Sequence, residues 1–210
     1  MFSKIKYLLA AYLLLLVAAC GKKNAAEYAH YLSDSDNGLT QKQTRGAVQF
    51  SATYQPLDFF VGRQLEGNER TAKGLETARQ AYLGLQYVHF QIYTEGVAAG
   101  QNALKQVVDK QLGDGKFLAA KDYYNFGMQP DLGIVSGVDT LPCAFYHLEQ
   151  TGNLGNRMAF LLGFKDDKKR VKPNFDADLR LYYVDRIISK DTLFFIFSKE
   201  KLNKTPELIF

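Results

Sequence analysis

Residues 48–55 read Val-Gln-Phe-Ser-Ala-Thr-Tyr-Gln, a regular alternation of apolar or small residues with polar ones. A period of two is typical of a strand that buries one face. Pro56 ends the strand because proline has no N–H to donate to a sheet. Residues 39–44 precede it across the turn residues Arg45 and Gly46. We therefore expect residues 39–55 to form a β-hairpin.

The middle of the chain favours helices around one further strand. Between Glu69 and Leu85, apolar residues recur at spacings of three and four, as on one face of a helix. Residues 57–65 are a shorter helix candidate. The stretch 87–93 is rich in β-branched and aromatic residues, which favours a strand. Further helices are expected at 103–112 and 117–126.

The last third of the chain favours β-structure. Short apolar runs are separated by Gly/Asn-rich or Asp/Lys-rich turns, and they lie at 132–135, 140–148, 158–164, 179–184 and 192–197. Short strands at this spacing indicate an antiparallel sheet or a small β-sandwich. The predicted fold class is therefore α+β: an N-terminal hairpin plus a C-terminal meander, with inserted helices.

The first nineteen residues have the pattern of a secretory signal. Lys4 and Lys6 form a short basic start, and Leu8 to Ala19 is almost wholly apolar. A membrane-spanning helix needs about 20 apolar residues, whereas this run is shorter and ends in small residues. We expect residues 1–19 to be a cleaved signal peptide rather than a permanent span.

The end of this segment, Leu16-Val17-Ala18-Ala19-Cys20, resembles the lipobox of bacterial lipoproteins, in which an aliphatic residue and two small residues precede a cysteine. The resemblance implies cleavage between Ala19 and Cys20. It also implies transfer of a diacylglyceryl group to the Cys20 thiol, and mature lipoproteins of this class carry three acyl chains. An ordinary signal peptide followed by a chance cysteine is the alternative.

Acylation at Cys20 would make the lipid bilayer a partner of the chain, because two or more acyl chains hold a protein firmly. The residue after Cys20 is Gly21, not the aspartate that commonly retains lipoproteins in the inner membrane. Resemblance to that sorting rule favours the outer membrane and leaves the periplasmic or surface leaflet open. Residues 20–38 are expected to be the lipidated cysteine and a tether, and 39–210 one globular α+β domain.

The charge balance gives no reason to expect a nucleic-acid partner. The chain has 26 Lys and Arg against 22 Asp and Glu. Removing Lys4 and Lys6 with the signal leaves 24 against 22, a net charge of +2. The run Asp166–Arg170 mixes both signs and is interpreted as a solvated turn.

Cys143 and the three histidines are the first candidates for chemistry. Once Cys20 is lipidated, Cys143 is the last cysteine, and a lone cysteine in a sheet is most often a small buried hydrophobe. His147 is four residues further on, about 13 Å along a strand, too far for a Cys–His hydrogen bond. His147 and Glu149 share a strand face and His89 could join them. However, no metal-binding spacing supports a metal site, and His30 stands alone.

The acids and the missing motifs favour neither a cofactor nor a metal. Asp34-Ser35-Asp36 and Asp176-Ala177-Asp178 resemble pieces of calcium loops, but the remaining ligands are missing. The sequence contains neither the Gly-x-Ser-x-Gly motif of serine hydrolases nor the phosphate-binding motif Gly-x-x-x-x-Gly-Lys-Ser/Thr. We therefore expect no catalytic residue, no metal and no cofactor.

Two functional classes stay open. The favoured one is a non-catalytic accessory or binding module of the cell envelope, with an envelope protein complex as partner. The alternative is an envelope hydrolase of cell-wall or glycan material, with Asp139, His147 and Glu149 converging in a cleft. A secreted immunity or inhibitor lipoprotein is a third, minor class. Residues 138–149 resemble uncharacterised envelope lipoproteins, which adds no activity.

Overall fold

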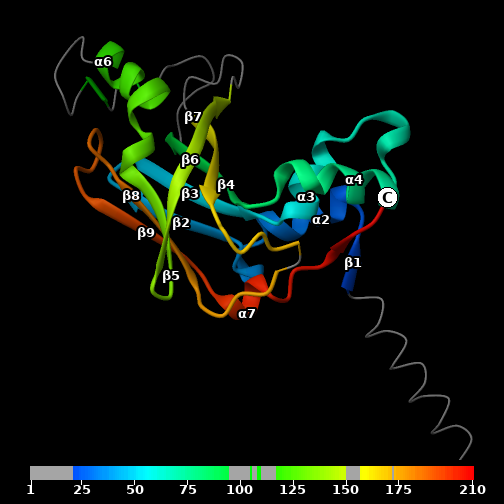
Figure 1. Cartoon of the computed structure of the whole chain (residues 1–210). Coiled ribbons are helices and arrows are strands. Elements are labelled where there is room, and N and C mark those ends of the chain that lie inside the picture. The colour runs from blue at the N-terminus through cyan, green and yellow to red at the C-terminus, as the bar shows by residue number, and fades with distance from the viewer. Residues whose placement is uncertain (1–20, 95–104, 106–107, 110–116, 150–156, 172) are drawn as a thin grey trace, which may run out of the picture.

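The computed structural model describes residues 21–94, 105, 108–109, 117–149, 157–171 and 173–210. Its main feature is one eight-stranded antiparallel sheet that curls into a nearly closed barrel (Figure 1). The strand order is β2-β3-β4-β7-β6-β5-β8-β9. The strands are β2 (Thr40–Arg45), β3 (Val48–Gln55), β4 (Leu85–Thr94), β5 (Leu132–Ser136), β6 (Asp139–Glu149), β7 (Arg157–Lys165), β8 (Leu179–Val184) and β9 (Thr192–Phe197). The predicted α+β class is confirmed, as an antiparallel sheet.

The predicted N-terminal hairpin is present as β2 and β3. The two strands pair from Thr40 opposite Thr53 to Arg45 opposite Val48. Gly46, in the turn, has φ of 58°, a left-handed conformation that glycine adopts without a steric penalty. The alternating apolar residues of β3 face the barrel interior, where Phe50 is fully buried.

The C-terminal strands do not form a continuous meander. β5, β6 and β7 are joined as neighbours, but β8 pairs with β5 rather than with β7. The other edge of β7 is already taken by β4. The long strand β6 pairs with both neighbours. Its residues 139–142 pair with β5, and its residues from Cys143 onward pair with β7, with a bulge between Cys143 and Phe145.

The barrel approaches closure between β2 and β9. The Gln43 side chain donates a hydrogen bond to the Phe194 carbonyl, and Arg45 lies 3.9 Å from Asp191. The strand pairs in the described part of the chain include no ladder between these two edges. Aromatic rings fill the interior; Phe90, for example, packs edge-on against Tyr183 and Phe195. Burial of such rings is the main stabilising contribution expected of this core.

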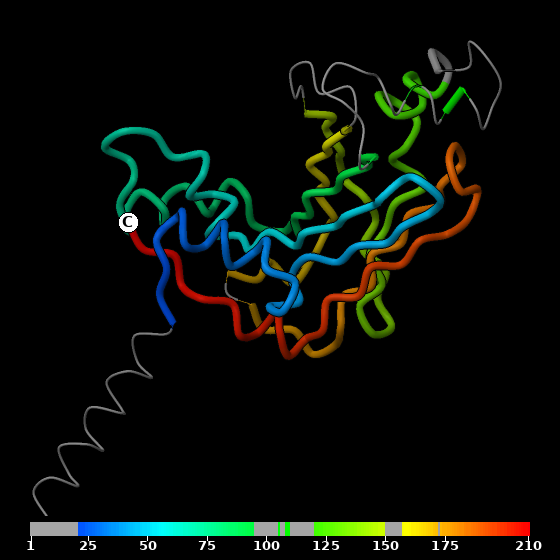
Figure 2. Tube along the Cα trace, turned by 180° about the vertical axis from the view of Figure 1, so that it is seen from behind, coloured from blue at the N-terminus to red at the C-terminus, as the bar shows by residue number. Residues whose placement is uncertain are grey.

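The helices between residues 25 and 82 gather at one end of the barrel, as Figures 1 and 2 show. The helices α3 (Leu57–Gln64) and α4 (Ala72–Tyr82) match the two predicted near 57–65 and 69–85. The Phe60 ring of α3 stacks on Tyr87 of β4 at 4.0 Å between centroids. The expected helix at 103–112 lies outside the described residues, apart from three positions. The one at 117–126 is α6 (Phe117–Asp122) followed by a π-helical turn at Tyr123–Gly127.

The predicted tether at residues 21–38 is corrected by the structure. Strand β1 (Lys22–Lys23) pairs in parallel with β10 (Glu207–Leu208), and helix α2 (Ala25–Ser33) follows directly. Tyr28 and Leu32, one helical turn apart, are both buried in the main core. This polar segment was interpreted as a tether because only these two apolar residues mark its buried face.

Residues 1–20, including the predicted signal and Cys20, lie outside the described residues. Among the residues that are described, no helix is long and apolar enough to cross a membrane.

Candidate functional site

The three residues of the predicted hydrolase cleft do not converge. Asp139 and Glu149 are the first and last residues of β6. Ten residue steps along a strand correspond to about 33 Å. Asp139 instead lies 3.5 Å from Lys168 in an exposed ion pair at the hairpin between β5 and β6. His147 is exposed on the other half of β6.

His89 and Glu149 do come together, although they are 60 residues apart. His89 Nε2 lies 3.1 Å from Glu149 Oε2, on the outer face of the sheet and across β7. Leu161 of β7 lies opposite both His89 and His147, so these three share one row. Two protein ligands are fewer than a zinc site uses. The described residues contain no group of three His, Cys, Asp or Glu side chains able to hold a metal.

Cys143 is a buried thiol, as predicted. It belongs to the interior cluster, and its Sγ donates to the Phe145 carbonyl at 3.2 Å. Burial raises the pKa of the thiol to about 12. Since the thiolate is the reactive form, Cys143 is protonated and inert at neutral pH. His89 and His147 are on the outer face, so neither can activate it.

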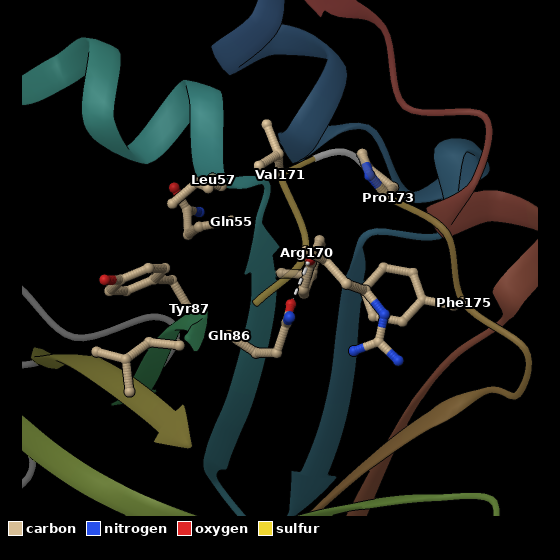
Figure 3. Close-up of a pocket in the computed structure, with 10 residues that line it drawn as sticks. Gln55, Leu57, Gln86, Tyr87, Arg170, Val171, Pro173 and Phe175 are labelled. Carbon is tan, nitrogen blue, oxygen red and sulfur yellow. Dashed lines mark hydrogen bonds between the residues drawn. The ribbon is translucent and has the colours of Figure 1, made fainter. Parts of the chain in front are cut away.

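A buried polar network lies beside a small pocket, whose lining residues Figure 3 shows. The Tyr54 hydroxyl donates to Gln86 Oε1 at 2.8 Å, and Gln86 Nε2 donates to Asp166 Oδ2 at 2.7 Å. Asp166 also accepts from Arg170, whose guanidinium lies 4.9 Å from the Phe175 ring centre. Figure 3 shows the Arg170 side chain beside the Phe175 ring. Burial raises the pKa of Tyr54 far above its usual value, so its hydroxyl stays a donor.

We interpret this hydrogen-bond network as structural rather than catalytic. The pocket beside it holds about 10 Å³, close to the minimum of about 10–15 Å³ that one water needs. Asp166 is 2% exposed and already accepts three hydrogen bonds, from Gln86, Arg170 and the Lys168 amide. The interpretation of Asp166–Arg170 as a solvated turn is therefore wrong for its two ends, which are drawn into the barrel.

A second buried carboxylate, Asp131, lies beside β8. Arg186 holds it with two hydrogen bonds, at 2.7 Å from Nε and 2.6 Å from Nη2. The Tyr123 hydroxyl donates to it at 2.9 Å. The Arg186 contact lowers the pKa of Asp131 below its usual value. This cluster was missed in the sequence, where no local motif marks it because Arg186 is 55 residues away from Asp131.

An open groove of about 650 Å³ runs between α3, α4 and β10. Its lining includes apolar Leu75 and Leu208, and Arg79 forms a fork with Asp58 at 2.6 and 2.9 Å. Gly62 lets β10 approach α3, since a Cβ there would lie 2.5 Å from a methyl group of Leu208. Ile209 and Phe210, at the groove edge, are 42% and 48% exposed. The groove was also missed in the sequence, because α3 and β10 are far apart in the chain and come together only in the fold.

Comparisons with known proteins place this chain in no family. No family model matches the sequence, and no curated protein matches it. Among solved structures, one similar chain comes from the crystal structure of a protein described as a novel protein of unknown function from Burkholderia pseudomallei K96243. It has 10% sequence identity and a TM-score of 0.36, over 86% of this chain and 92% of that chain. The similarity is too low for an argument about function.

Proposed function

We propose that the chain is a lipid-anchored module of the bacterial cell envelope, which binds another envelope component rather than catalysing a reaction. Its anchor is Cys20, which is acylated and becomes the first residue of the mature chain when residues 1–19 are removed, and its membrane is the outer membrane. The lipobox-like sequence before Cys20 supports the anchor. The observation that supports binding most directly is the groove between α3, α4 and β10.

The groove has the properties of a binding site for a small ligand or a peptide. Its volume of about 650 Å³ falls within the range of about 300–1,000 Å³ that is usual for ligand sites. Apolar side chains line it beside a fixed ion pair, and Arg79 and Asp58 are 12% and 18% exposed. Arg79 is held by two hydrogen bonds to Asp58 and also pairs with Glu76, so the groove wall carries a fixed cluster of charged groups.

The hydrolase alternative has lost the observation that motivated it. It depended on Asp139, His147 and Glu149 sharing a cleft, and Asp139 lies at the opposite end of β6 from the other two. The pair His89–Glu149 offers one carboxylate, whereas most glycoside hydrolases use two carboxyl groups on either side of the bond.

The anchor is tested with Cys20→Ala. We expect the wild-type chain to incorporate labelled fatty acid and to be recovered with membranes. The Cys20→Ala variant should remain unlabelled, and either uncleaved or released in soluble form. Labelling that persists in Cys20→Ala would overturn the assignment of the anchor.

The binding role is tested by crosslinking from the groove. A photoreactive residue replaces Ile209 at the groove edge, and a matched control replaces Arg180 on the exposed face of β8. We expect one envelope component to be captured from position 209 and not from position 180, in the anchored chain. Capture of the same set from both positions would contradict a specific groove.

A further inference from the structure

The point at which the chain enters the fold is held firmly. Lys22 lies opposite Glu207 and Lys23 opposite Leu208 in the parallel pair of β1 and β10. The Ile209 amide donates to the Lys23 carbonyl at 3.0 Å. Helix α2 begins at once, with Asn24 and Glu27 forming a capping box. Only Gly21 separates Cys20 from this rigid strand.

A short connection fixes where an anchored domain can sit. Two residue steps span at most about 7 Å, so acyl chains on Cys20 would hold the start of β1 at the surface of the bilayer. β10 lies beside that start, and the helix α7 (Lys199–Leu202) precedes β10 by four residues. Acylation of Cys20 would therefore bring the edge of the domain that carries the start of β1 toward the lipid.

The hairpin tip between β5 and β6 lies at the same edge. Figures 1 and 2 both show β1, α7 and this tip along the lower end of the molecule. The tip is a two-residue turn, Gly137-Val138, in which Gly137 supplies the positive φ of 62°. The Val138 side chain is 100% exposed. Turn positions usually carry polar residues or glycine, so a fully exposed valine at this tip presents an apolar side chain to whatever this edge faces.

We infer that the folded domain lies directly on the bilayer with this edge, and that Val138 is a second point of lipid contact besides the anchor. This inference rests on the proposed acylation of Cys20. The contact that we infer is apolar, through Val138, and three lysines of this edge have acidic neighbours. Lys168 is 3.5 Å from Asp139, Lys204 is 2.6 Å from Glu200, and Lys22 lies opposite Glu207.

The chain contains no tryptophan, so a single introduced tryptophan reports on its own surroundings. The probe is Val138→Trp, and the matched control is Phe126→Trp. Phe126 is 82% exposed and precedes β5, while Val138 follows it. The five residues of β5 put about 13 Å between these two sites, in addition to the connecting turn. Both variants are purified as the full acylated chain and inserted into phosphatidylcholine vesicles with and without brominated lipid.

We expect the emission of Val138→Trp to shift to the blue and to lose intensity in brominated vesicles, with the same loss when anionic lipid is added. The emission of Phe126→Trp should not change. Equal quenching at both positions, or none at Val138→Trp, would overturn the inference. Intact mass is measured first, because a chain that lacks acyl groups refutes the anchor itself and is thereby distinguished from a wrong orientation.

A second variant tests the short connection. Fifteen Gly and Ser residues inserted between Gly21 and Lys22 leave Cys20 and the folded domain unchanged. We expect this chain to stay with the vesicles while the quenching of Val138→Trp falls toward that of Phe126→Trp. Quenching that stays at its original level would show that the short connection does not set the orientation.

Discussion

Asp166 and Asp131 are both buried carboxylates held by an arginine, and they differ in what surrounds that arginine. Asp166 is 2% exposed and Asp131 3%. The Arg170 side chain next to Asp166 is 11% exposed and packs on Phe175. The Arg186 side chain next to Asp131 is 62% exposed. The same two residue types thus form an enclosed pair in one place and a pair open to water in the other.

The difference determines how much each pair contributes to stability. Removing one partner of an enclosed pair leaves a buried charge that water cannot reach, which costs about 3–5 kcal/mol. Where one partner is exposed, water and salt replace most of the lost attraction, so that partner contributes about 0–1 kcal/mol. We therefore expect the Asp166 cluster to hold the fold and the Asp131 cluster to be the more adjustable of the two.

Asp166→Asn should give the largest effect. The asparagine keeps one acceptor oxygen, but its NH2 group then faces donors from Gln86, Arg170 or the Lys168 amide. We expect the free energy of unfolding to fall by about 3–5 kcal/mol in urea titrations. The control is Asp167→Asn, whose side chain is 86% exposed. An equal loss in both variants would remove the special role of Asp166.

Asp131→Asn should give an intermediate effect. It weakens two charge-assisted hydrogen bonds from Arg186 and one from Tyr123, while Arg186 can turn into solvent. Hydrogen bonds to charged groups contribute about 1.5–3 kcal/mol. We expect the free energy of unfolding to fall by about 2 kcal/mol in the same titration. A loss as large as that of Asp166→Asn would contradict the distinction between the two pairs.

The smallest effect is expected in the pH dependence. Arg186 lowers the pKa of Asp131, so this carboxylate stabilises the fold above its unfolded pKa of about 3.9, and the stability is lost as the pH falls through the lower folded pKa. Arg186→Gln removes that donor. Between pH 2 and 6, we expect its unfolding free energy to rise less with pH than that of the wild type. Identical acid limbs in the two proteins would refute this linkage.

Several elements could be predicted because their signal is local. The alternation of residues 48–55 gave the strand β3, and the three- and four-residue spacing from Leu75 to Leu85 gave α4. The strand expected at 179–184 is β8, and its neighbouring residues Tyr182 and Tyr183 differ in burial as in a strand, because Tyr183 is fully buried while Tyr182 is partly exposed. The burial of Cys143 also followed from its place in an apolar strand.

Other features had no local signal. Tyr28 and Leu32 were too few to mark α2 against a polar background, so its segment was interpreted as a tether. A contact between His89 and Glu149 was considered, but it forms across β7 and so depends on the strand order, which has no local signal. The groove could not be anticipated because it forms where α3, α4 and the C-terminal strand meet.

Neighbouring residues and short patterns were enough to predict the α+β class, the hairpin and the positions of most strands, and the anchor at Cys20 stays a prediction from a pattern of the same kind. The strand order, the pairing that holds β1 and the burial of particular acids became apparent only in the folded structure. Gln86 and Asp166 are 80 residues apart, and Asp131 and Arg186 are 55 apart. These two carboxylates are buried where donors from distant segments meet them, because the cost of removing a charge from water must be offset by such contacts.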